Sequence, residues 1–207
     1  MPNRRRWLRI LITGVAALLV AGESVQAVQR HKPIAGVSGR FAAPVLTPAM
    51  TARWARQTLA GAVVNRQSQT ITYQNSSRHV RIVALAAPVA LHRHGMQWVI
   101  DGLVNPTIQM PVGAQVQVIV INADTTYWHG FAVTAVHDFV HAPDVPIFAG
   151  AFIGMVPPIT PAGDQWAETT FVAARVGTFH YVCWLPGHAA RGMRGTWAVV
   201  RPPSATR

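Results

Sequence analysis

Residues 178–200 of the chain read TFHYVCWLPGHAARGMRGTWAVV, and this stretch decides the fold. The alternation of side chains over residues 178–183 predicts a strand that ends with Cys183 facing inward. Pro186-Gly187 then turns the chain, and residues 196–200 predict the next strand. The sequence therefore predicts two adjacent strands joined by a loop that carries a thiol, an imidazole and a thioether.

This loop has the composition of a metal site. Cys183 is the only cysteine of the chain, and His188 and Met193 follow it within eleven residues. A lone cysteine cannot form an internal disulfide, a four-cysteine zinc site or a cysteine-ligated iron–sulfur cluster. The other interpretation is a buried small side chain, a loop histidine and a core methionine. Three soft ligands around one Pro-Gly loop favour a blue-copper electron-transfer site, which needs one further histidine.

His129 is the best candidate for that histidine. It follows a predicted strand that ends near Asn122, and its aromatic neighbours Trp128 and Phe131 can exclude water. His92 and His94 form one His-x-His pair, whereas a trinuclear copper cluster needs several such pairs. His137 and His141 are spaced as on one helix face, but nearby prolines disfavour a helix. His180 is on the strand face opposite to Cys183, and His31 and His79 have no partner. We predict that none of these binds the copper: His31, His79, His92, His94, His137, His141 and His180.

The rest of the chain predicts an all-β domain. Short strands punctuated by proline and glycine are typical of a Greek-key β-sandwich or barrel. A short helix is expected over residues 51–64, with Thr51 as its N-cap and Trp54 near its buried face. Residues 137–163 are rich in proline and predict a long loop. Strands are expected at residues 70–73, 79–83, 97–100, 105–111, 114–121, 131–136, 169–174, 178–183 and 196–200.

The amino terminus has the features of an export signal. Residues 1–27 contain a cluster of arginines, a thirteen-residue apolar stretch and the cleavage-site pattern Val25-Gln26-Ala27. The apolar stretch is shorter than the ~20 residues of a membrane-spanning helix, so an uncleaved anchor is the second interpretation. Residues 3–9 also resemble a twin-arginine signal. We expect a flexible linker at residues 28–48 and one folded domain at residues 49–204.

The charge balance is strongly basic. The chain has 18 basic residues, 17 of them arginine, against seven carboxylates. The arginines are scattered and no nucleic-acid-binding motif is present, so we expect an acidic redox partner and not a nucleic acid. Acid unfolding comes largely from protonation of carboxylates that are paired in the native state. A chain with so few of them is expected to withstand low pH, and an early acid transition in a denaturation curve would contradict this.

The ligand loop also resembles that of a known family. Residues 181–183, followed by residues 186–190 and 192–193, are similar to the rusticyanins, cupredoxins of acidophilic iron-oxidising bacteria. Supporting similarities lie at residues 70–73, 79–80, 105–107, 111, 113–114 and 129–131. The resemblance runs from about residue 50 to the carboxyl terminus and includes the short amino-terminal helix.

The resemblance implies a cupredoxin fold and one type 1 copper ion, ligated by His129, Cys183, His188 and Met193. It implies a periplasmic, acid-stable, monomeric one-electron carrier of high potential, whose partners are redox proteins such as c-type cytochromes or a terminal oxidase. Contact with a membrane is expected only if the amino-terminal segment is not cleaved. Two departures stand out: Gly130 replaces a hydroxyl residue of the family, and the chain has one lysine where the family is lysine-rich.

Other functions remain open at this stage. A copper chaperone or scavenger would favour an exposed and exchangeable site, and a sulfocyanin-like carrier of another respiratory chain would have much the same ligands. An oxidase or nitrite reductase needs further copper ligands, and a binuclear copper centre needs two cysteines. We therefore expect an electron carrier and not an enzyme.

Two sets of neighbours are expected to serve electron transfer. His188 is the candidate for the electron exit, with a small apolar docking patch made of Leu185, Ala189 and Ala190. A dry aromatic environment disfavours the additional charge of Cu(II) and raises the reduction potential. The candidates for that environment, which can equally be ordinary core residues, are Phe131, Tyr181, Trp184 and Trp197.

Overall fold

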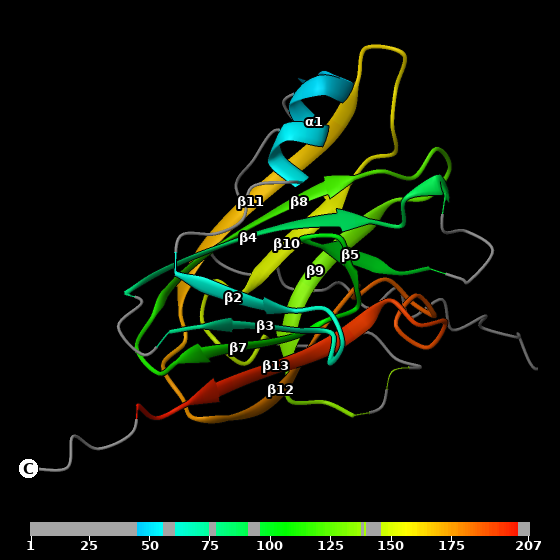
Figure 1. The fold of residues 1–207 in the computed structure, drawn as a ribbon. Coiled ribbons are helices and arrows are strands. Elements are labelled where there is room, and N and C mark those ends of the chain that lie inside the picture. The colour runs from blue at the N-terminus through cyan, green and yellow to red at the C-terminus, as the bar shows by residue number, and fades with distance from the viewer. Residues whose placement is uncertain are drawn as a thin grey trace, which may run out of the picture. The chain divides into compact units, whose positions relative to one another are not determined.

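A computed structural model describes residues 45–55, 61–74, 78–90, 96–137, 139 and 146–202, which form two β-sheets and one short helix (Figure 1). The first sheet contains, in spatial order, β1 (Val45–Leu46), β11 (Asp164–Val172), β8 (Gln115–Asn122), β4 (His79–Ala86), β5 (Trp98–Ile100) and β6 (Leu103–Val104). The second contains β10 (Phe152–Val156), β9 (His129–Thr134), β12 (Gly177–Val182), β13 (Arg194–Val200), β7 (Thr107–Pro111), β3 (Thr70–Tyr73) and β2 (Ala62–Asn65).

The two sheets form a sandwich, and of the two predicted alternatives the closed barrel is not observed among the described strands. Strands β4 and β8 pair in parallel, as do β13 and β7, whereas β12 runs antiparallel to both β13 and β9. Because the connections between parallel neighbours must cross from one end of the domain to the other, strands distant in sequence become adjacent. Because β12 runs antiparallel to β9, the start of β9 and the end of β12 lie at the same end of the second sheet.

The core lies between the sheets, and its largest side chains are aromatic. Strand β8 alternates as predicted: Val116, Val118 and Val120 join the main core, whereas Ile119 and Ile121 face the other side. The largest fully buried side chains are Trp98, Trp197, Tyr73, Tyr181 and Phe131. Burial of such rings supplies about 25 cal/mol per Å² of apolar surface. All five belong to the core cluster that also contains Cys183 and Met193 of the ligand loop.

Helix α1 (Pro48–Ala55) is shorter than predicted and begins earlier. Thr47, and not Thr51, precedes it and accepts a hydrogen bond from the Met50 N–H at 3.3 Å through its hydroxyl oxygen. The prediction of helix up to residue 64 is wrong at its end, where residues 62–65 form β2. None of the residues of α1 is fully buried, but Trp54, predicted near the packed face, is half-buried and its ring meets Trp166 edge-on at 5.2 Å.

Four short strands were not expected from the sequence. Strand β10 lies within residues 137–163, where a long loop was predicted, and pairs with β9 at the edge of the second sheet. Val45 and Leu46 lie in the predicted linker but form β1 against β11. Strands β2 and β6 complete the set. Strands β1 and β6 have two residues each, too few for an alternating pattern, and β10 lies in a segment whose prolines indicated a loop.

The predicted export signal at residues 1–27 and residues 28–44 of the predicted linker lie outside the described residues. Within the described part of the chain, none of the helices has the length and apolar character needed to cross a membrane.

Candidate metal centre

Three buried side chains converge at one end of the sandwich. The Cys183 Sγ lies 3.4 Å from the His188 Nδ1 and 3.8 Å from the His129 Nδ1, and the two Nδ1 atoms are 3.3 Å apart. All three residues are at least 95% shielded from solvent. Three of the four residues predicted as ligands are thus brought together with their ligand atoms facing one another.

The size of this triangle fits a metal ion. Bonds of about 2.0–2.3 Å, as nitrogen and sulfur make to zinc, would separate the ligand atoms of a trigonal plane by about 3.5–3.8 Å. The three observed separations of 3.3, 3.4 and 3.8 Å lie close to that range. One thiolate and two imidazoles in a plane are the donor set typical of a blue-copper centre.

Backbone hydrogen bonds connect the predicted ligand residues within the loop. The Cys183 N–H donates to the Met193 carbonyl and the Met193 N–H donates to the His188 carbonyl, both at 3.0 Å. Gly187 and Gly192 adopt φ angles of 77° and 106°, which a residue with a side chain rarely adopts. The spacing of Cys183, His188 and Met193 is therefore fixed by the fold of this loop.

Met193 is fully buried directly after the loop. The Trp98 Nε1–H donates to its carbonyl at 3.2 Å, and the Asn105 side-chain amide donates to the Gly192 carbonyl at 2.9 Å. The Asn105 Oδ1 in turn accepts from the Trp98 N–H at 2.9 Å. Trp98 and Asn105 thus attach the loop to the first sheet. The sequence pattern did not single out Trp98, since a tryptophan in a strand is equally typical of an ordinary core.

His129 is the first residue of β9, so the strand itself places the ring. Its Nε2 lies 3.1 Å from the Asp124 Oδ2, and both side chains are buried. Asp124 belongs to a turn after β8 that Asn122 organises: the Asn122 Oδ1 accepts from the Asp124 N–H, and its Nδ2 donates to the Tyr127 carbonyl, each at 2.9 Å. Sequence reasoning missed Asp124, although an Asn-Ala-Asp turn directly ahead of a candidate ligand is a usable signal.

Burial raises the pKa of the Cys183 thiol to about 11, against the smaller opposing effect of hydrogen bonds from the Gly130 and Leu185 N–H groups. A thiol in such surroundings loses its proton near neutral pH only when a cation takes the proton's place. Burial, together with the neighbouring His129, lowers the pKa of His188 to about 4. His188 is therefore a neutral imidazole, the form that binds metals, well into the acidic range.

The Gly130 N–H points at the Cys183 Sγ at 3.4 Å, and the indole of Trp184 lies over the same glycine. A β-carbon added at residue 130 would come within 2.8 Å of the Trp184 Cδ1. Gly130, noted above as a departure from the family's hydroxyl residue, thus leaves its side-chain space to the tryptophan ring, which is anchored by a hydrogen bond of 2.9 Å from its Nε1 to the Ile153 carbonyl.

The predicted aromatic environment is present. Phe131 stacks on Tyr181 at 6.2 Å and meets Trp197 edge-on at 6.3 Å, and all three rings are fully buried. Trp98 meets Phe131 edge-on at 5.8 Å. These rings belong to the main core, the cluster that also contains Cys183 and Met193, and Trp184, the fourth candidate, is half-buried outside it.

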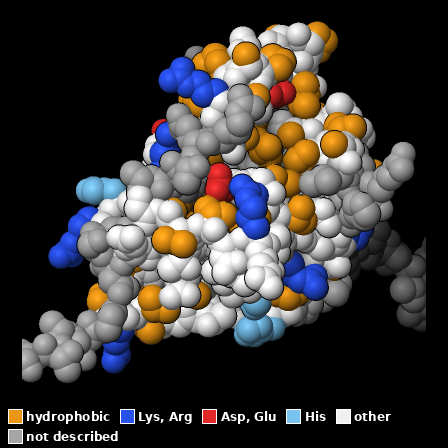
Figure 2. All heavy atoms as spheres, in the orientation of Figure 1, with side chains coloured by type: hydrophobic (Ala, Val, Ile, Leu, Met, Phe, Trp, Pro, Cys, Tyr) orange, Lys and Arg blue, Asp and Glu red, His pale blue; other side chains and the backbone are white. Residues whose placement is uncertain are grey.

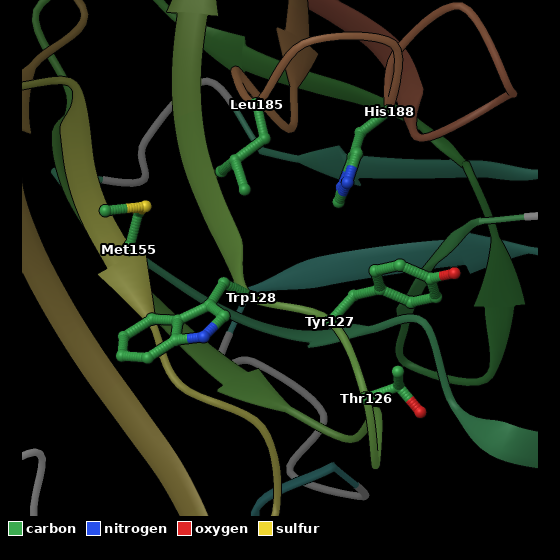
Figure 3. A pocket seen from close by; sticks show the side chains of 6 residues that line it. All are labelled: Thr126, Tyr127, Trp128, Met155, Leu185 and His188. Carbon is green, nitrogen blue, oxygen red and sulfur yellow. The ribbon is translucent and has the colours of Figure 1, made fainter.

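An open apolar pocket adjoins the centre at His188 (Figure 3). Its lining residues are Thr126, Tyr127, Trp128, Met155, Leu185 and His188. Leu185 was predicted at this surface, but Ala189 is buried against Ala132 and Val182 and contributes little to it. The exposed aromatic rings of Tyr127 and Trp128 were not expected, because aromatic residues next to a ligand were assigned to the interior.

The other histidines lie apart from the centre where they are described. His180 and His137 contact each other, with 3.1 Å between the His180 Nε2 and the His137 Nδ1, and His79 is exposed at the start of β4. In the described part of the chain, the grouping of His129, Cys183 and His188 is the single cluster of three that could hold a metal. His31, His92, His94 and His141 lie outside the described residues.

Known proteins with similar sequences are rusticyanins, and no family model matches the chain. The rusticyanin of Acidithiobacillus ferrooxidans is 35% identical over 128 residues, which cover 61% of this chain and 78% of that protein. The rusticyanin of Acidithiobacillus ferridurans is 34% identical over 129 residues, which cover 61% of this chain and 65% of that protein. The matched part is thus slightly less than two thirds of the longer relative.

Solved structures give the same result. A rusticyanin structure from Thiobacillus ferrooxidans is matched with a TM-score of 0.64 and 30% identity, over 76% of this chain and 96% of the other. A structure of reduced rusticyanin gives 0.63 and 26%, over 76% and 99%. Together with the His-Cys-His centre, these similarities assign one type 1 copper ion to this protein. Since the similarity extends over nearly the whole of a solved rusticyanin, this chain belongs to the rusticyanin family of cupredoxins.

Proposed function

We propose that this protein is a periplasmic blue copper protein that carries single electrons between respiratory redox partners. The observation that carries the proposal is the buried triangle of the His129 Nδ1, the Cys183 Sγ and the His188 Nδ1. Residues 1–27 would direct export, residues 28–48 would link, and residues 49–204 would form the copper domain. The protein would act as a monomer without catalysing a reaction of its own.

The residues that would hold the copper ion are His129, Cys183 and His188, with Met193 as a weak thioether ligand. When bound, the ion would supply one-electron chemistry by alternating between Cu(I) and Cu(II). Met193 and the aromatic rings belong to the same buried cluster as Cys183, and the Trp184 indole lies over Gly130, so these side chains would keep the centre rigid and dry. A rigid ligand set and exclusion of water both reduce the rearrangement that accompanies a change of charge.

His188 is the proposed electron exit, because its ring is both part of the triangle and part of the pocket lining. The apolar lining, which includes Tyr127, Trp128 and Met155, would dock against a partner and exclude water from the contact. A c-type cytochrome or a terminal oxidase would be such a partner. Arginines are scattered on the face seen in Figure 2 and are not gathered into a dense basic patch, which suits a weak and transient contact.

Iron oxidation at acidic pH is the proposed pathway, since the sequence relatives come from Acidithiobacillus ferrooxidans and Acidithiobacillus ferridurans. The low number of carboxylates supports work at low pH. Complete burial of Cys183 favours a carrier over a copper chaperone, because a chaperone must expose its ligands to exchange the ion.

A visible absorption spectrum of the purified protein with added Cu(II), with metal stoichiometry on the same sample, tests the proposal. We expect an intense blue thiolate-to-copper band at one copper ion per chain, which the Cys183→Ser variant loses. A colourless wild-type protein, or a band that survives in Cys183→Ser, would refute the proposed ligand set. Redox cycling with retention of the metal would separate a carrier from a chaperone.

A further inference from the structure

The contact between Asp124 and His129 gives the metal centre a feature beyond its four proposed ligands. Both side chains are almost completely shielded from solvent, at 1% and 0% exposure. The Asp124 Oδ2 lies 3.1 Å from the His129 Nε2, the ring nitrogen that faces away from the triangle. An imidazole that binds a metal through one nitrogen usually donates the proton of its other nitrogen, and a carboxylate strengthens its donation to the metal.

The turn around Asp124 is built to hold a carboxylate rather than a neutral acid. Its Oδ1 accepts hydrogen bonds from the Thr126 N–H at 2.7 Å and from the Tyr127 N–H at 3.2 Å. Its own N–H donates to the Asn122 Oδ1 at 2.9 Å. Two backbone donors on one oxygen and a ring nitrogen on the other make the side chain an acceptor on both oxygens, which is the pattern of an ionised carboxylate.

We propose that Asp124 is a positioning residue of the copper centre: it accepts the Nε2 proton of His129, leaves Nδ1 for the metal, and favours Cu(II) over Cu(I) through its buried negative charge. The charge acts at short range in a part of the protein without bulk water, where charge interactions are stronger than at a surface. Asp124 thus opposes the aromatic environment, which favours Cu(I), and sets the potential of this protein below the value that its core alone would give.

This inference rests on the proposed copper function, and Asp124→Asn tests it. The amide has nearly the same shape but no charge, so the preference of the site for Cu(II) over Cu(I) should fall about tenfold. This change corresponds to a rise of about 59 mV in the reduction potential. Glu168→Gln is the matched control. It removes one carboxylate from β11 of the first sheet, where the Gln117 side-chain amide donates to the Glu168 Oε2 at 2.9 Å, and it should leave the potential close to that of the wild type.

The outcomes separate the inference from the proposed function. A wild-type protein without the blue band would overturn the copper function itself. If the wild type is blue and both variants have the same reduction potential as the wild type, the role of Asp124 is overturned and the copper function stands. A shift of the same size in both variants would also overturn it, since the effect would then be one of overall charge.

A measurement on the wild type decides the matter even if Asp124→Asn does not fold. In the diamagnetic Cu(I) form, proton–nitrogen correlation spectra report the Nε2–H of both histidines. The His129 proton should lie downfield and exchange slowly with water, since it is held between two buried groups. The His188 ring adjoins the open pocket, so its proton should exchange faster. Equal exchange of the two protons would overturn the inference.

Discussion

Trp184 occupies the space that a side chain at Gly130 would need, and Gly130 donates its N–H to the sulfur of Cys183. The glycine therefore allows the backbone to approach the ligand while the indole covers it from outside. Trp184 is held by its hydrogen bond to Ile153 and by packing against Phe152 at 5.3 Å. A glycine that seemed from the sequence to remove a polar contact thus makes room for an aromatic cover.

Gly130→Ser should destabilise the protein, because the new β-carbon forces the Trp184 indole to move. Overpacking of this kind costs about 1–3 kcal/mol, and thermal denaturation should show a lower Tm. The double variant Gly130→Ser with Trp184→Leu should recover part of the loss, since a smaller side chain leaves room for the serine. If the single variant is as stable as the wild type, or the double variant is less stable than the sum of the two single changes, the two residues do not compete for space.

His188→Gly should slow electron exchange and open the copper to added imidazole. The ring lines the open pocket, so its removal leaves a passage from solvent to the ligand position. Stopped-flow kinetics with a small redox partner should show slower transfer, and added imidazole should restore the blue band. His129→Gly is the matched control, because His129 is fully buried and imidazole should restore that variant less well. Unchanged transfer kinetics in His188→Gly would contradict its role as the exit.

Met193→Leu should raise the reduction potential. Leucine has a similar volume but no sulfur, so the change removes a weak donor that stabilises Cu(II) more than Cu(I). A tenfold loss of Cu(II) preference corresponds to a rise of about 59 mV in a one-electron potential, which voltammetry measures directly. Met155→Leu is the control, since Met155 is an exposed methionine of the pocket lining. A potential that falls, or that rises equally in both variants, would contradict axial ligation by Met193.

The sequence was sufficient for features whose signal is local. Cys183 and His188 lie in one loop of fixed geometry, and His129 begins a strand, so spacing and strand pattern alone predicted the three buried residues that converge. The same holds for β3, which was predicted with its observed bounds, Thr70–Tyr73.

Features that depend on contacts across the fold could not be predicted. Asp124 is an exception: it lies five residues from His129, and the Asn-Ala-Asp turn was a usable signal that the sequence prediction missed. Trp184 covers Gly130 only because β10 supplies the carbonyl of Ile153, and β10 itself was hidden in a proline-rich segment. The start of α1 was also within reach of the sequence, because Thr47 followed by Pro48 fits an N-cap with proline at the first helical position, a signal that the prediction did not use.

His180 provides a pH dependence that the number of carboxylates does not predict. The ring is half-buried on β12, contacts His137 and lies near Arg194, and burial together with these two neighbours lowers its pKa below the usual value. The unfolded chain titrates near the ordinary histidine pKa of about 6.5. As the pH falls through 6.5 the unfolded chain takes up the proton first, so this residue favours unfolding progressively until the pH falls below its folded pKa.

His180→Gln should therefore reduce the loss of stability on acidification, since glutamine keeps a polar group beside His137 but takes up no proton. Urea denaturation of the wild type and the variant at neutral pH and at pH values below about 6.5 measures this, with the difference between the two proteins growing as the pH falls. His79→Gln, a change of an exposed histidine on the other sheet, should retain the pH dependence of the wild type. Parallel curves for the wild type and His180→Gln would show that the contact of His180 with His137 does not disfavour protonation in the folded state.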